Sequence, residues 1–391
     1  MYEQIPLIDA DSHVCEQPDL WTSRMPKRLA DEIPHVEWDE EYKGYRWHIA
    51  GDPLQGVAAY AQAGWKEYPP RHPHAIEDAD PGSYDPKVRL ERLDEYGIYA
   101  QVLYPNLLGF SVRSFLKLDH KLATECVRTY NDFLTEFAAA NPDRLLPIAV
   151  LPFWDLKESV RELHRVAEAG HRGVLLAGSY AKIKMPNIWE PEWVPVLKTI
   201  EELGLPVNFH SGFNDVDEET LRERFTSVRG ADFARDTVPG VGSSIAHVSN
   251  IVCRGLCRDY PGINFVIVES GAGWLPFVME SLDWQWKNHG AVQEEPGWEL
   301  PSYYVRRQVY GMYWFEKAAV GRIVDLIPDN IMFETDYPHP VGLAPGPASF
   351  AYNPRKMAVD SMLGIDEPIV RKVFFETAAK LYKVADPGMS A

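Results

Sequence analysis

Four short apolar segments of this chain each run into an acidic residue or a histidine, and this pattern constrains the fold more than any other feature. The segments are 5–8 before Asp11 and His13, 205–209 before His210, 263–268 before Glu269, and 331–333 before Asp336. Because proline cannot continue a central strand, the chain must leave the sheet at Pro338. Side chains alternate along a strand, so Asp11 and His13 point to the same side. A helix cap would explain any one of these residues, but polar groups at several strand ends are typical of α/β enzymes.

The stretches between these segments alternate between helical and strand patterns. Asp85-Pro86 is a helix start, Val88 and Leu93 share one face of that helix, and Gly97 ends it. Further helices are predicted over 119–140, 155–169, 191–203, from Ser243-Ser244 past His247, 274–286 and 367–384, and further strands over 98–104, 145–151, 173–176 and within 305–312. Strands that alternate with helices in this way predict a parallel sheet.

Two long segments interrupt this alternation. Residues 14–84 follow the first strand, where a short connection is expected, and they carry many aromatic residues, including Trp38 and Trp65. A connection of this length is usually a lid or an oligomer contact. Residues 211–242 form a second long insertion, after His210. We therefore predict a single domain, 1–391, with insertions after the first and fifth strands.

Composition excludes several classes of function. The net charge of −18 comes from 39 basic and 57 acidic residues, and this argues against nucleic acid as a partner. No apolar run is long enough to span a bilayer, and the start of the chain does not match a signal peptide. The four cysteines follow no zinc-binding spacing. These features predict a cytoplasmic protein that acts on a small molecule.

Several motifs resemble those of a known family. They are Asp-Ala-Asp-Ser-His at 9–13, His210, Thr-Asp-Tyr-Pro-His at 335–339, and the approaches to the third and fourth strands at 141–145 and 169–174. They are similar to those of the amidohydrolase superfamily, in the branch of the aminocarboxymuconate-semialdehyde decarboxylase type. The resemblance covers nearly the whole chain. It implies a metal-dependent (β/α)8 TIM barrel whose metal ligands are Asp11, His13, His210 and Asp336.

The chain departs from this family at three places. The decarboxylating relatives have a histidine that acts on the substrate at the end of the sixth strand, where this chain has Glu269. Asp11 stands where several relatives have histidine or glutamate. This difference leaves the identity of the metal open. Residues 376–379 replace a common Gly-Asn-Ala, a change that we interpret as structural.

The predicted ligands indicate the chemistry of the site. Two aspartates and two histidines suit Zn, Fe or Mn, and such an ion makes a bound water acidic, so that Asp336 can take its proton. Glu269 can act as a second base, can orient a histidine ligand, or can bind a second ion with Asp11, Glu16 and His247. His247 alone is equally explained as a packing residue. We expect one or two divalent ions per chain, with Asp336, Glu269 and His247 as candidate catalytic residues.

Hydrolysis and decarboxylation can both use such a site. Decarboxylation needs a proton donor, and a carboxylate with an ordinary pKa is ionised at neutral pH. The sequence therefore favours a metal-dependent hydrolase of an ester, thioester or amide of a bulky acid. The alternatives are a non-oxidative decarboxylase of an aromatic or unsaturated acid, and a barrel that only binds a ligand. Trp274, Tyr337 and His339 are predicted to contact the substrate, and a homodimer is expected.

Overall fold

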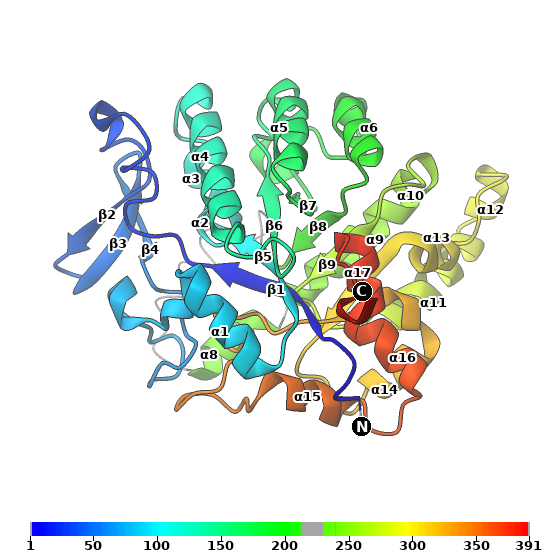
Figure 1. Ribbon diagram of the computed structural model, residues 1–391. Coiled ribbons are helices and arrows are strands. Elements are labelled where there is room, and N and C mark those ends of the chain that lie inside the picture. The colour runs from blue at the N-terminus through cyan, green and yellow to red at the C-terminus, as the bar shows by residue number, and fades with distance from the viewer. Residues whose placement is uncertain (1, 213–229, 239, 390–391) are drawn as a thin grey trace.

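Eight parallel strands form a closed barrel in the computed structural model, which describes residues 2–212, 230–238 and 240–389 (Figure 1). The strands follow one another around the barrel in the order β1, β11, β10, β9, β8, β7, β6, β5. They are β1 Ile8–Val14, β5 Ala100–Pro105, β6 Leu145–Val150, β7 Gly173–Leu175, β8 Val207–His210, β9 Phe265–Val268, β10 Val309–Tyr313 and β11 Ile331–Phe333. Every residue of these strands is buried. This confirms the predicted (β/α)8 barrel.

Helices surround the barrel and connect its strands (Figure 1). They are α1 Pro86–Tyr96, α2 Leu107–Phe110, α3 Val112–Phe115, α4 His120–Ala138, α5 Leu156–Glu168, α6 Val194–Leu203, α8 Gly230–Thr237, α9 Gly240–Cys253, α10 Leu256–Asp259, α11 Leu275–Asn288, α12 Ala291–Glu294, α13 Pro301–Gln308, α14 Val320–Leu326, α15 Pro354–Ser361, α16 Glu367–Arg371 and α17 Thr377–Tyr382. The side chain of Asp85 accepts from the N–H groups of Lys87 and Val88, and Gly97 ends α1 with a φ of 70°. Both are the cap residues that the sequence predicts.

Two predicted boundaries differ from the structure. Ser243 does not begin a helix, because α9 already starts at Gly240, and His247 lies in the middle of α9. The seventh strand is β10, which starts at Val309, and the residues before it form α13. Periodicity alone does not separate a short buried strand from the helix that leads into it.

The insertion after β1 contains a small sheet that the sequence analysis did not predict. The strands β2 His35–Asp39, β3 Gly44–Ile49 and β4 Asp52–Gly56 pair antiparallel, in that order. The sheet lies to one side of the barrel (Figure 1). Of the second predicted insertion, residues 213–229 and 239 lie outside the described part of the chain.

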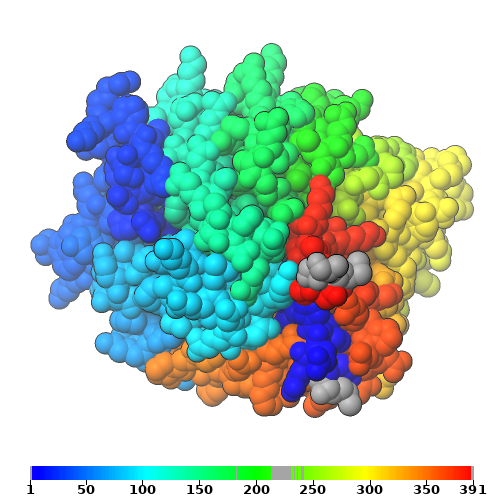
Figure 2. Space-filling model, in the orientation of Figure 1, coloured from blue at the N-terminus to red at the C-terminus, as the bar shows by residue number. Residues whose placement is uncertain are grey.

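The N-terminal segment is held by the C-terminal part of the chain. Tyr2 donates from its hydroxyl to the carbonyl of Ile365, and Arg355 donates to the carbonyl of Tyr2. Figure 2 shows the first residues, in blue, packed between the orange and red segments of this C-terminal part. Within the described residues, no helix is both long enough and apolar enough to cross a membrane.

Candidate metal centre

Two buried histidines point at each other from strands β1 and β8. The Nε2 atoms of His13 and His210 lie 2.9 Å apart. The Nδ1 atom of His13 lies 3.2 Å from the carbonyl of Pro105, and that of His210 lies 2.8 Å from the carbonyl of Ser211. A carbonyl only accepts, so each Nδ1 donates and each neutral ring turns the lone pair of its Nε2 towards the other ring. Two facing lone pairs require a proton or a cation between them.

Two buried aspartates complete this arrangement. Asp11 Oδ1 lies 3.5 Å from Nε2 of His13 and 3.6 Å from Nε2 of His210, and Asp336 Oδ1 lies 3.6 Å from Nε2 of His13. Among the described residues, neither oxygen of Asp11 nor Oδ2 of Asp336 has a hydrogen-bond partner, and Oδ1 of Asp336 lies within hydrogen-bond distance only of the ring of His339. Buried carboxylates without partners are costly, and a divalent ion with nitrogen and oxygen ligands would satisfy all four residues. The residues present therefore fit a divalent metal ion.

The pKa values in this region agree with a missing positive charge. Burial raises the pKa of Asp336 well above its usual value, and the neighbouring Glu269 and Asp11 add to that rise. Burial lowers the pKa of His13, which keeps its ring neutral. Burial also opposes charge on His210, but the Asp11 carboxylate outweighs it and raises the pKa of His210 to about 9. A bound cation would relieve this excess of negative charge.

His339 lies beside Asp336, but its ring is stacked on His13. Its Nδ1 is 2.9 Å from Asp336 Oδ1, so distances alone permit an ion shared by His13, Asp336 and His339. The rings of His13 and His339 are 3.6 Å apart at an interplanar angle of 18°. A metal ion lies in the plane of the imidazole that binds it, and two nearly parallel stacked rings do not share such a point. The arrangement therefore favours Asp11, His13 and His210 as the ligand group, with Asp336 next to it.

Asn106 fixes the orientation of the His339 ring. The side-chain amide of Asn106 donates to the carbonyl of Val14, so its oxygen faces Nε2 of His339, which lies 2.6 Å away. Nε2 of His339 therefore carries a hydrogen and donates to Asn106. Both ring nitrogens of His339 thus contact protein groups, and the predicted substrate contact would have to come from elsewhere on the ring.

Glu16 binds backbone amides and not the other predicted metal ligands. Its Oε1 accepts from the N–H groups of Asn106 and Leu107, at 3.0 and 2.8 Å, and it thereby caps the start of α2. Burial raises the pKa of Glu16 to about 7, and these two bonds limit the rise. The clusters of three or more ligand atoms among the described residues do not include Glu16.

Glu269 lies at the edge of the centre. Its Oε2 is 3.6 Å from Nδ1 of His210, the ring atom that faces away from His13, and its N–H donates to Glu334. Glu269 and Asp336 have φ values of 51° and 55°, which residues other than glycine rarely adopt and which cluster at functional sites. His247 packs elsewhere, against Gly178 and the ring of Phe209. Neither Glu269 nor His247 belongs to a cluster of three ligand atoms among the described residues.

Two of the residues predicted to contact the substrate bond other protein groups with their polar atoms. Tyr337 is buried beneath the guanidinium of Arg89, 4.5 Å from its ring centroid, and its hydroxyl donates to Asp80. Trp274 donates from its indole N–H to the carbonyls of Ser270 and Gly271. Both residues therefore make contacts within the protein that hold the fold. They were predicted as substrate contacts because they lie close to Asp336 and Glu269 in the sequence, which does not show these internal contacts.

The sequence analysis did not assign four further residues that lie next to the centre. They are Tyr60, Asn106, Phe110 and Glu334. Glu334 is buried, and burial together with the charges of Asp11 and Glu269 raises its pKa well above the usual value. Glu334 directly follows the buried apolar strand 331–333, and this position could have identified it as a residue of the site. The other three lie on connections, where no periodicity marks them.

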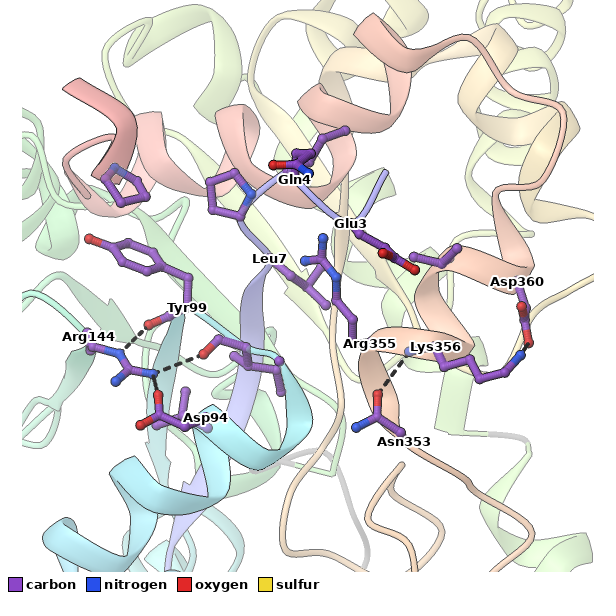
Figure 3. A pocket seen from close by; sticks show the side chains of 17 residues that line it. Glu3, Gln4, Leu7, Asp94, Tyr99, Arg144, Asn353, Arg355, Lys356 and Asp360 are labelled. Atoms are coloured by element: carbon purple, nitrogen blue, oxygen red, sulfur yellow. Dashed lines mark hydrogen bonds and ion pairs between the residues drawn. The ribbon is translucent and has the colours of Figure 1, made fainter. Parts of the chain in front are cut away.

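A cavity of about 1060 Å³ lies at the opposite end of the barrel. It is lined by residues that precede the strands, such as Leu7, Tyr99 and Arg144. Figure 3 shows Arg144 bonded to Asp94 and to two backbone carbonyls, and Lys356 bonded to Asp360. Arg144 and Lys356 thus each pair with an acid of the same lining. In such barrels this end supports stability and the other end carries the chemistry.

Comparison with known proteins identifies relatives of this chain. It is 25% identical over 269 residues to the gamma-resorcylate decarboxylase of Rhizobium radiobacter. The aligned region covers 64% of this chain and 76% of that protein. The structure of an amidohydrolase from Mycobacterium avium subsp. paratuberculosis K-10 has a TM-score of 0.76 at 18% identity, covering 98% of this chain and 99% of that one. A dihydroxybenzoic acid decarboxylase from Polaromonas sp. JS666, with bound manganese and the inhibitor 2-nitroresorcinol, has a TM-score of 0.63 at 19% identity, covering 99% and 100%.

These relatives correct the favoured reaction. The sequence analysis preferred a hydrolase, because Glu269 replaces the histidine that donates the proton in decarboxylating relatives. The curated relatives are named as decarboxylases, and so are several of the similar structures. The preference assumed an ordinary pKa for the carboxyl groups of the site, whereas burial and neighbouring charges raise the pKa of Glu334 and of Asp336 well above the usual value. The amidohydrolase family profile Amidohydro_2 matches residues 19–384, and the chain therefore belongs to the amidohydrolase family.

Proposed function

We propose that this protein is a metal-dependent, non-oxidative decarboxylase of an aromatic or unsaturated carboxylic acid. The observation that carries the proposal is the similarity to gamma-resorcylate decarboxylases over 64% of the chain. The buried cluster of Asp11, His13 and His210 supports it, because it lies at the end of the barrel where this fold places its chemistry.

We assign the divalent ion to Asp11, His13, His210 and Asp336. Manganese is our first choice, since the mixed nitrogen and oxygen donors suit it and the dihydroxybenzoic acid decarboxylase of Polaromonas holds manganese. When bound, the ion supplies positive charge that holds the substrate's carboxylate and offsets the negative charge that develops during the reaction. Asn106 and His339 keep Asp336 in position beside it.

The reaction also needs a proton. Breaking the bond between the ring carbon and the carboxylate releases carbon dioxide and leaves an electron pair on carbon, which takes up one proton. Four carboxyl groups meet at this site: Asp11, Glu269, Glu334 and Asp336. Like charges in a buried site do not all ionise, and even a divalent ion leaves the four in excess. This group of carboxyls is therefore our candidate source of the proton.

We assign the delivery of this proton to Glu269. Its side chain is 18% exposed, whereas those of Asp11 and Asp336 are fully buried, so Glu269 can reach a substrate at the mouth. It also occupies the position where the decarboxylating relatives carry their histidine. The carboxyl group would give its proton to the ring carbon and recover one from solvent.

A substrate panel tests the proposal. The Mn²⁺-loaded protein is incubated with 2,6-dihydroxybenzoate, other hydroxybenzoates and open-chain unsaturated acids, and carbon dioxide release is measured. The same protein after chelation is the control, and acyl esters and thioesters are tested in parallel for acid release. We expect carbon dioxide from at least one acid only with metal present. Ester or thioester cleavage without carbon dioxide release from any acid would reject the proposal.

A further inference from the structure

The insertion after β1 is tied to the loop that carries Asp336. The N–H groups of Gln62 and Ala63 both donate to the carbonyl of Pro338, at 2.7 and 3.0 Å. The backbones of Gly64 and Gly346 are in direct contact, because a Cβ on Gly346 would lie 2.9 Å from Cα of Gly64. This part of the insertion therefore lies at the mouth of the barrel, beside the candidate metal centre.

Two aromatic rings from different segments meet at this point. Tyr60 precedes the anchored residues, and its ring stacks on Phe110 with centroids 5.0 Å apart and lies 5.2 Å from His339. Phe110 ends α2, and its ring lies 5.4 Å from His210 and 5.9 Å from His13. Both side chains are only partly buried. Part of each side chain is thus accessible to solvent close to His13, His210 and His339.

We propose that Tyr60 and Phe110 form an aromatic wall that the substrate's ring contacts, and that this wall makes the site select aromatic acids over open-chain acids. The inference rests on the proposed function and narrows it. A planar ring whose carboxylate is held at the metal centre would lie beside these two partly accessible aromatic side chains. Contact between two aromatic rings favours binding by roughly two- to tenfold beyond the area that it buries. An open-chain acid buries less area and lacks this contact.

The test measures binding rather than turnover. Salicylate is the aromatic probe and sorbate the open-chain conjugated probe, and each is titrated into the Mn²⁺-loaded protein by calorimetry. In Tyr60→Leu and Phe110→Leu, which remove a ring but keep an apolar side chain, salicylate affinity should fall by up to about tenfold and sorbate affinity should change little. Tyr60→Phe keeps the ring and should bind salicylate within about twofold of the unmodified protein.

The outcomes separate this inference from the proposed function. Equal salicylate affinity in the unmodified protein and both leucine variants would contradict the proposed aromatic wall. A loss of salicylate affinity in Tyr60→Phe as large as in Tyr60→Leu would contradict it as well. If salicylate binds and the wall is confirmed but no acid is decarboxylated, only the proposed function fails. Mn²⁺ affinity and thermal unfolding show whether each variant is folded. If a leucine variant is not folded, Tyr60→Met or Phe110→Met provides the comparison.

Discussion

Single side chains decide which atoms of this centre can reach a substrate and which hold the centre together. Glu269 is partly exposed and lies 3.6 Å from His210, yet the described clusters of ligand atoms leave it out. Glu16 is buried and satisfies two backbone amides. The two glutamates are therefore expected to respond differently to the same substitution.

Glu269→Gln tests the assigned proton donor. A glutamine cannot deliver a proton, so turnover should fall by roughly two to four orders of magnitude while the Mn²⁺ content stays unchanged. A loss of metal would instead make Glu269 a ligand, and a milder loss, about ten- to a hundredfold, would indicate that it only orients His210. Glu316→Gln is the matched control, because Glu316 is a partly buried acid that accepts from the amides of Ala272 and Gly273.

Removal of the acceptor oxygen of Glu16 should lower stability and leave metal binding unaffected. Glu16→Gln keeps the oxygen that accepts from Asn106 and Leu107, so both the Mn²⁺ content and the free energy of unfolding should stay close to their original values. Glu16→Ala leaves two buried amides without a partner and should cost about 2–4 kcal/mol in denaturant unfolding. Loss of metal in Glu16→Gln would show that Glu16 is a ligand after all.

At the scale of elements, helix α1 is linked to strand β1 through Arg89. This buried guanidinium donates to the carbonyls of His13 and Gly82 and to the side chain of Gln101. Lysine keeps the charge but not the planar fork, so Arg89→Lys should lower the free energy of unfolding by about 2–4 kcal/mol. Arg92→Lys on the same helix, at a partly exposed ion pair, should cost about 1 kcal/mol or less. Equal effects in urea unfolding would contradict the role of Arg89.

At the scale of the whole molecule, closure of the barrel gathers negative charge that a cation would neutralise. Saturating Mn²⁺, at roughly a hundred times its dissociation constant, should stabilise the fold by about 2.7 kcal/mol, and chelation should remove this gain. His210 has a pKa of about 9 in the metal-free protein, so a proton must leave it before metal binds. The raised pKa stabilises the metal-free protein fully below about 6.5, the usual histidine value, and this gain is lost as the pH rises through 9.

The increase in thermal stability on adding Mn²⁺ should therefore grow from pH 6.5 to pH 9. Differential scanning calorimetry with and without chelator measures it. An increase that is constant over this range would mean that His210 releases no proton on metal binding. The homodimer and the cytoplasmic location remain predictions, because a single chain does not test them.

The sequence by itself determined the barrel and much of the candidate centre. Asp11, His13, His210 and Asp336 each follow a buried apolar strand, and the carboxyl ends of parallel strands meet at one end of a barrel whatever the loops do. The family and the presence of a divalent site followed from the same residues. The reaction did not, because it depends on pKa values that burial and neighbouring charges set.

Only the tertiary structure decided where side chains on the connections point. Glu16 bonds backbone amides 90 and 91 residues away, and Tyr337 packs beneath Arg89, a residue far from it in the chain. The small sheet within residues 14–84 and the contact of Tyr60 with Phe110 also depend on segments that meet only in the folded chain. Strand ends are positioned by backbone periodicity, which the sequence displays. Side chains on connections are positioned by contacts between distant segments, which exist only after the chain has folded.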